Sequence, residues 1–166
     1  MTLRRSATAA IAAVVVLAVV GTGAAATAGG TSSQTSANQL SGTWLATVVR
    51  PAPLPALQTI HVFTDSGATS VVDTDSPATH TTQYGAWKRI EGRLYASTGV
   101  FFRFNAQGQF VGSQKIDRTI ELGADGDTFK QVSRVTVLDA GGNVVTTFIA
   151  RATAERMQID EIPDLP

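Results

Sequence analysis

Few side chains in this sequence could carry acid–base or nucleophilic chemistry, and no known catalytic spacing joins them. The 166 residues contain two histidines, His61 and His80, and no cysteine. Without cysteine, thiol catalysis, disulfides and Cys-ligated metals are excluded. The histidines lack the His-x-His and His-Glu-x-x-His spacings of zinc sites, and there is no Gly-x-Ser-x-Gly elbow. We therefore predict no metal site, and a catalytic residue cannot be assigned beyond His61, which would serve only if the protein is an enzyme.

A second set of candidates comes from polar residues that interrupt apolar alternation. His61, Gln114, Arg118, Gln131 and Ser133 lie on rows that we expect to face a core. A buried polar group costs about 1–3 kcal/mol unless it is hydrogen-bonded. These groups must therefore pair with one another or face a cavity. The alternatives are structural roles. Arg118 could lie at a barrel end or pair with an acidic residue, and His61 could be a half-buried histidine whose hydrogen bonds are made within the protein.

The elements that must position these residues are predicted to be β-strands. Clusters of Gly, Asn and Asp separate alternating runs rich in Val, Ile, Thr and Phe, and no stretch has a helical period. The expected strands are 42–50, 57–64, 68–74, 84–91, 93–104, 109–122, 128–138 and 144–157. Consecutive strands with short connections pair antiparallel, and closing the sheet removes exposed edges. We predict an all-β, eight-stranded antiparallel up-and-down barrel, with a two-sheet β-sandwich as the alternative.

Alternation also predicts which side chains line the interior of this barrel. On the fifth strand the more apolar row is expected to point inward, with Val100 and Phe102 at its centre. On the eighth strand, alanines on the same row as Phe148 leave room for a hollow level. An eight-stranded barrel can hold one small ligand. The predicted ligand-binding residues are His61, Val100, Phe102, Gln114, Ile116, Arg118, Phe148 and Ala152.

The first strand opens with Gly42-Thr43-Trp44 directly after a polar stretch. A Gly-x-Trp at this position resembles the opening of lipocalins and other calycins, which are up-and-down barrels that bind small hydrophobic molecules. The resemblance implies that Trp44 closes the barrel floor and that an arginine near the end of the last strand packs across it. Arg151 and Arg156 both lie on that strand, and either could take this part. Small barrels of the allene-oxide-cyclase-like kind are similar at this level and include cyclases.

The N-terminus resembles a secretory signal peptide. Arg4 and Arg5 precede an apolar run over 9–20, and Ala26-Thr27-Ala28 fits a signal-peptidase site. An uncleaved anchor is the alternative. We expect a signal peptide at 1–28, a flexible spacer at 29–40, the barrel domain at 41–158 and a C-terminal tail at 159–166. The expected location is secreted or extracytoplasmic, with no stable membrane insertion after cleavage.

Composition limits the partners. The 13 basic and 13 acidic residues cancel, so nothing predicts a nucleic-acid partner. No cofactor is required. The first hypothesis is a secreted calycin-like protein that binds a small apolar or amphipathic molecule in the barrel, its polar end oriented by Arg118, His61 and Gln114. The alternatives are a cyclase- or isomerase-type enzyme that uses the same cavity and a non-catalytic exported module that binds another protein.

Overall fold

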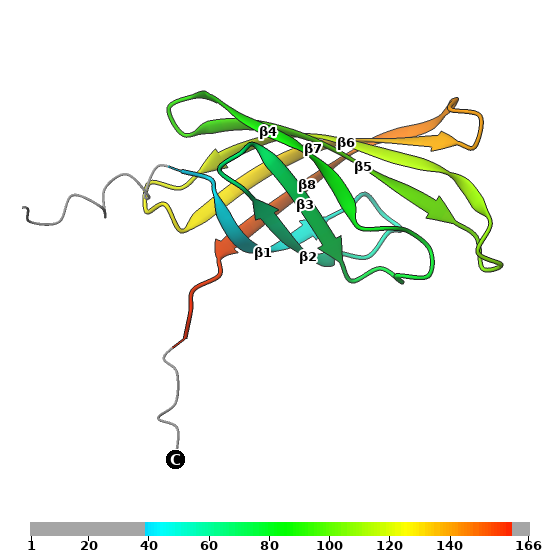
Figure 1. Cartoon of the computed structure of the whole chain (residues 1–166), viewed down its shortest axis with the longest axis horizontal. Helices are drawn as coiled ribbons and strands as arrows, with labels where there is room; N and C mark the ends of the chain where they lie inside the picture. Colours follow the sequence, from blue (N-terminus) through cyan, green and yellow to red (C-terminus); the bar gives the residue numbers. More distant parts are fainter. Residues whose placement is uncertain (1–38, 161–166) are drawn as a thin grey trace, which may run out of the picture. The chain divides into compact units, whose positions relative to one another are not determined.

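The computed structural model describes residues 39–160, so the predicted signal peptide lies outside the described part of the chain. This part contains strands and no helix (Figure 1). The strands are β1 (Gly42–Val49), β2 (Leu57–Phe63), β3 (Ala68–Asp73), β4 (Gln83–Glu91), β5 (Leu94–Phe104), β6 (Phe110–Leu122), β7 (Thr128–Asp139) and β8 (Val144–Arg156). Within these residues no helix is long and apolar enough to cross a membrane.

The eight strands form a closed antiparallel barrel in sequence order, which confirms the predicted fold and excludes the sandwich. Closure is made by β1 and β8, whose register runs from Trp44 opposite Arg156 to Val49 opposite Arg151. The loops after β1, β3, β5 and β7 lie at one end of the barrel, which we call the mouth. The loops after β2, β4 and β6 lie at the other end with both termini of the described chain, and we call that end the floor.

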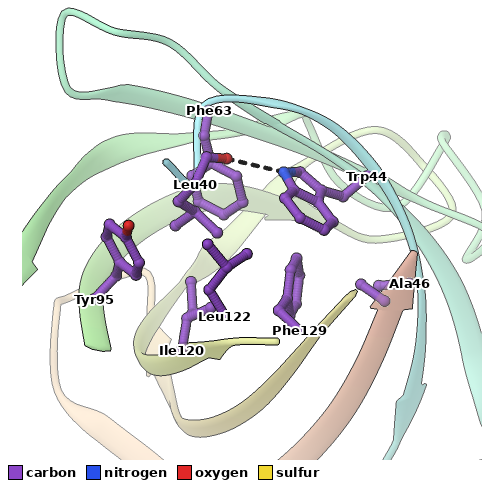
Figure 2. Close-up of a cluster of buried hydrophobic side chains, with 9 residues drawn as sticks. Leu40, Trp44, Ala46, Phe63, Tyr95, Ile120, Leu122 and Phe129 are labelled. Carbon is purple, nitrogen blue, oxygen red and sulfur yellow. Dashed lines mark hydrogen bonds between the residues drawn. The ribbon is translucent and has the colours of Figure 1, made fainter. Parts of the chain in front are cut away.

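The floor is a packed apolar cluster (Figure 2). Its fully or nearly fully buried members come from most of the strands: Leu40, Trp44, Ala46, Phe63, Tyr95, Ile120, Leu122, Phe129 and Ala154. Trp44 is completely buried, and its ring lies 5.0 Å from that of Phe129. Leu40, the last residue of the predicted spacer, is also completely buried. It accepts a hydrogen bond of 2.9 Å from Trp44 Nε1 through its carbonyl oxygen.

Arg156 covers Trp44 from the outside of this cluster. Its guanidinium carbon lies 4.1 Å from the centre of the Trp44 ring. The same group donates to the carbonyl oxygens of Ser41 at 2.6 Å and Gly126 at 2.8 Å. Gly42 has a φ of 132°, and a Cβ there would collide with Arg156. Of the two arginines that the sequence proposed for this place, Arg156 occupies it, whereas Arg151 is exposed on the outer face.

The predicted orientation of β5 is wrong. Phe101, Ser97 and Tyr95 are buried, whereas Val100 is 39% exposed and Phe102 is 54% exposed. Both side chains lie on the outer face, so neither lines the interior. The inward row is less apolar because it must accommodate polar groups from neighbouring strands: Ser97 lies opposite Arg118 on β6. Choosing the more apolar row therefore selected the wrong face.

Candidate functional site

A cavity of about 490 Å³ lies inside the barrel between the floor and the mouth. Ligand pockets in proteins span about 300–1,000 Å³, so the volume suits one small molecule. Every strand contributes at least one residue to the wall, and β4 contributes Gln83. Apolar wall positions such as Ile116, Val135 and Phe148 lie among polar ones. The cavity exists because the interior rows at this level carry small or polar residues instead of the large aromatic residues of the floor.

Arg118 is the charged group at the base of this cavity. Its side chain is buried, with 6% of the residue exposed. One Nη2 proton is donated to Gln83 Oε1, while Nε and Nη1 have no hydrogen-bond partner among the described residues. No carboxylate in the described part forms an ion pair with it. The neighbouring Asp117 belongs to the outer face, where its carboxylate binds Thr98, Lys115 and Arg134.

Burial lowers the pKa of Arg118 to about 10, with the charge of Asp117 acting in the opposite direction. The guanidinium therefore remains protonated at neutral pH. A buried charge is costly unless it is paired and hydrogen-bonded. Arg118 thus places a positive charge at the cavity wall, and its buried Nε and Nη1 groups have no partner among the described residues, an arrangement that favours a negatively charged or strongly hydrogen-bond-accepting group nearby.

Gln83 and Gly99 hold Arg118 in place. Gln83, on β4, is buried and accepts from Arg118, while its own Nε2 has no partner among the described residues. Gly99 lies on β5 opposite Ile116, two pairs along the ladder from the Ser97–Arg118 pair and on the same face. A Cβ at Gly99 would overlap the side chain of Gln83. Glycine is therefore required here so that Gln83 can cross the interior to the guanidinium.

His61 lies on β2 where the cavity meets the floor. Its ring centre is 5.9 Å from those of Phe63 and Phe129. Nε2 is hydrogen-bonded to Thr59 Oγ1 at 2.8 Å, and Nδ1 has no partner within the described chain. Burial and then the charge of Arg118 lower the pKa of His61 to about 3. The imidazole is therefore neutral at physiological pH.

A second polar pair lies on β7. Gln131 Nε2 donates to Ser133 Oγ at 2.8 Å, and Gln131 Oε1 is left without a partner among the residues described. Both residues are buried and both line the cavity. Together with Arg118, Gln83 and His61 they form a polar belt around the base of the cavity. This belt is incompletely hydrogen-bonded within the described protein, which is rare for buried groups.

Charged residues surround the mouth. Arg50, directly after β1, forms an ion pair of 2.7 Å with Asp75 and donates to the carbonyl oxygen of Pro55 at 2.9 Å. His80 Nε2 lies 3.1 Å from Asp73 Oδ1, and the His80 ring is tilted against that of Phe101 with 5.0 Å between the ring centres. These contacts hold the loops 50–56 and 74–82 at the mouth. The cavity therefore has a polar base, an apolar middle level that we call the waist (Ile116, Val135 and Phe148) and a charged mouth.

The structure brings together most of the residues that the sequence proposed for a ligand site. His61, Gln114, Ile116, Arg118 and Phe148 all line the cavity. Ala152 is buried but does not line the cavity, although its pairing partners Val48 and Gln131 do. Val100 and Phe102 are on the outside, and Phe101 and Arg103 from the same strand line the cavity instead.

Gln83 and Ser97 were missed by sequence reasoning. Gln83 precedes the predicted start of its strand at 84, and Ser97 is on the β5 row that was assigned outward. The signal for Ser97 lies in the two rows of β5. If the more apolar row faces out, the row with the small and polar residues faces polar partners inside.

Within residues 39–160 no group of three or more His, Asp or Glu side chains is placed to hold a metal ion. The polar belt consists of nitrogen donors, amides and hydroxyls, which suit an organic ligand. No protein-family model matches the chain, and no curated protein matches it.

Proposed function

We propose that this protein binds one small amphipathic molecule inside the barrel, with a negatively charged or strongly accepting head group at Arg118. The observation that carries the proposal is a buried guanidinium that faces a cavity of ligand size without a carboxylate partner in the described chain. An anionic head would pair with that charge and share its free N–H groups, as arginine does with carboxylates.

The order of the layers supports a defined orientation of the ligand. The polar belt of Arg118, Gln83 and Gln131 lies at the base, and the apolar residues Ile116, Val135 and Phe148 lie nearer the mouth. A molecule with one polar end would therefore enter head first and leave its apolar body against the waist. This layering favours an amphipathic ligand over a purely apolar one.

Binding is better supported than catalysis. The only buried titratable base in the described interior is His61, and its pKa of about 3 makes it a weak proton acceptor at neutral pH. Efficient general bases have a pKa near the working pH. His61 is instead suited to donate or accept a hydrogen bond in its neutral form.

We further propose that the protein is a secreted calycin-like barrel. The stacking of Arg156 on the buried Trp44 supports the resemblance that Gly42-Thr43-Trp44 suggested. N-terminal sequencing of protein collected from the culture medium tests secretion. A mature chain that begins near Gly29 is the expected result, and a full-length chain in the membrane fraction would contradict it.

The ligand proposal is tested with two fluorescent probes of the same shape, anilinonaphthalene sulfonate and the neutral phenylnaphthylamine. Both should saturate near one probe per chain. Arg118→Leu should weaken the sulfonate probe by about tenfold or more, as for a lost charge-assisted hydrogen bond, and should change the neutral probe little. Arg103→Leu, which removes another cavity-lining arginine nearer the mouth, is the matched control.

Failure of both probes to bind the wild-type protein would contradict the proposal and leave the protein-binding module as the leading hypothesis. Equal loss of both probes in Arg118→Leu would show that Arg118 shapes the cavity without selecting an anion. Recovery of a chemically altered natural ligand would favour the cyclase- or isomerase-type alternative.

A further inference from the structure

Strand β8 is longer than the strand that closes the barrel against it. Its pairing with β1 ends at Arg151 opposite Val49, whereas its pairing with β7 continues to Val144. The chain after Val49 turns into the loop 50–56, and none of the described backbone hydrogen bonds joins that loop to β8. The β7–β8 hairpin, orange in Figure 1, projects beyond β1. Residues 144–150 therefore present an open strand edge on the side away from β7.

One other open edge of comparable length exists in the described barrel, and it is protected. Beyond the end of β3, strand β4 continues without a partner on that side over Lys88–Glu91. This edge carries Lys88, Arg89 and Glu91, and its register shifts at Ile90. Charged side chains and bulges are the devices by which proteins prevent strand edges from pairing with other chains.

The β8 edge has only half of that protection. A bulge lies at Val145, because Val144 pairs with Leu138 and Thr146 with Val137. From Thr146 to Ala150 the edge is regular and uncharged, with the sequence Thr-Thr-Phe-Ile-Ala. β-branched and aromatic residues favour strands, and this stretch contains no proline, glycine or charge. The exposed outward residues Thr147 and Ile149 offer no repulsion to an approaching strand.

We propose that this edge pairs with the same edge of a second copy of the chain. The β4 edge is charged and bulged, so the complementary uncharged edge that the described chain offers is β8 itself. Antiparallel pairing of Thr146–Ala150 with its own copy generates a closed two-fold dimer. In that register Phe148 lies at the two-fold axis, and Thr147 lies opposite Ile149 of the second copy and diagonal to its Thr147, within reach of a long side chain.

Pairing would also place a further strand beside one wall of the cavity. Phe148 and Ala150 line the cavity from this part of β8, where β1 is not paired with it. The second copy's strand would extend the wall beside Phe148. The inference does not depend on what the cavity binds, because it rests on backbone pairing alone.

The test is sedimentation velocity of the purified full chain over a concentration series, with lysine or glutamate at the edge. A ladder of this length is a small interface, so we expect a concentration-dependent dimer in the wild type. Thr147→Lys should shift the mass from two chains to one. The matched control is Thr119→Lys, also on an exposed outward threonine but on β6, which is paired on both sides. It should remain dimeric.

Mixing makes the prediction specific. Thr147→Lys and Thr147→Glu should each be monomeric alone and should form a mixed dimer when combined, because the two opposite charges are then diagonal neighbours on the same face of the paired strands. This result cannot arise from misfolding. A wild-type monomer at every concentration would overturn the proposal, as would a dimer that persists in Thr147→Lys.

Discussion

The two ends of the barrel interior are built from the same alternating strands but have different contents. At the floor, aromatic and aliphatic residues from most of the strands fill the space, and the polar atoms of Trp44 and Arg156 have partners. In the cavity, buried polar atoms of Arg118, His61, Gln83 and Gln131 lack partners within the described chain. The floor is arranged for stability, and the cavity carries a cost in stability that a bound molecule would offset.

The two levels differ in the kind of side chain that fills them. A packed interior needs only apolar volume, and the floor meets that need with Trp44, Phe63 and Phe129. At the level of the cavity, the polar belt and Gly99 stand where large apolar side chains could have filled the interior. The missing side chain of Gly99 makes room for Gln83. Changes at the floor should therefore affect folding, and changes in the cavity should affect binding.

The largest expected effect is at the floor. Trp44→Ala should lower the free energy of unfolding by about 3–5 kcal/mol, because it removes a fully buried large aromatic side chain and the surface on which Arg156 stacks. Urea titration followed by circular dichroism measures the loss. A loss below about 1 kcal/mol would mean that the floor does not anchor the barrel.

The next effect is a pH dependence that originates at the base of the cavity. The pKa of His61 is about 3 in the folded protein and 6.5 in the unfolded chain, so the unfolded chain binds the extra proton. The resulting stability is complete above pH 6.5 and is lost as the pH falls toward 3. Between pH 6.5 and 4.5 the loss should be about 2–3 kcal/mol.

Replacing the histidine isolates this contribution. His61→Gln should flatten the unfolding free energy between pH 6.5 and 4.5, and His80→Gln, which leaves His61 in place, is the control. The lowered pKa values of Asp117, Asp125 and Asp139 act in a lower pH range, since these carboxylates protonate below their usual value near 3.8. A slope that is unchanged in His61→Gln would contradict the buried neutral imidazole.

A smaller effect of opposite sign should come from the polar belt itself. Replacing both Gln83 and Arg118 by leucine should raise the free energy of unfolding by about 1–3 kcal/mol, because a buried charge and its incompletely bonded partner give way to apolar contacts. The same variant should lose the preference for the sulfonate probe. Lower stability of this variant together with retained binding of the sulfonate probe would contradict the proposed difference between the floor and the cavity.

The smallest effect should be on the outside of β5. Phe102→Thr should lower the free energy of unfolding by no more than about 1 kcal/mol, since the side chain is largely exposed and loses only its edge contact with the Phe110 ring, while threonine still favours a strand. Phe101→Thr, its neighbour on the inward face, should cost several times more and should weaken both probes. Thermal and urea unfolding of the two variants side by side decide which face of β5 is inside.

The strand positions and the closed barrel could be predicted because turn residues and alternation act locally. The same reasoning placed His61, Gln114 and Arg118 on inward rows, and these residues do line the cavity. It failed at β5 because a row facing a polar site is less apolar than the row facing solvent. It also missed Leu40, whose burial depends on the packing of the whole floor and on the Trp44 indole that it binds.

The proposed ligand is one amphipathic molecule, held in the cavity by its acidic or accepting head at Arg118. Native mass spectrometry of the protein isolated from its own culture medium tests it most directly. We predict one adduct per chain, a molecule with a single acidic or accepting group and an apolar body, retained in Arg103→Leu and lost in Arg118→Leu. A bare chain in the wild type, or an adduct that survives in Arg118→Leu, would contradict the account.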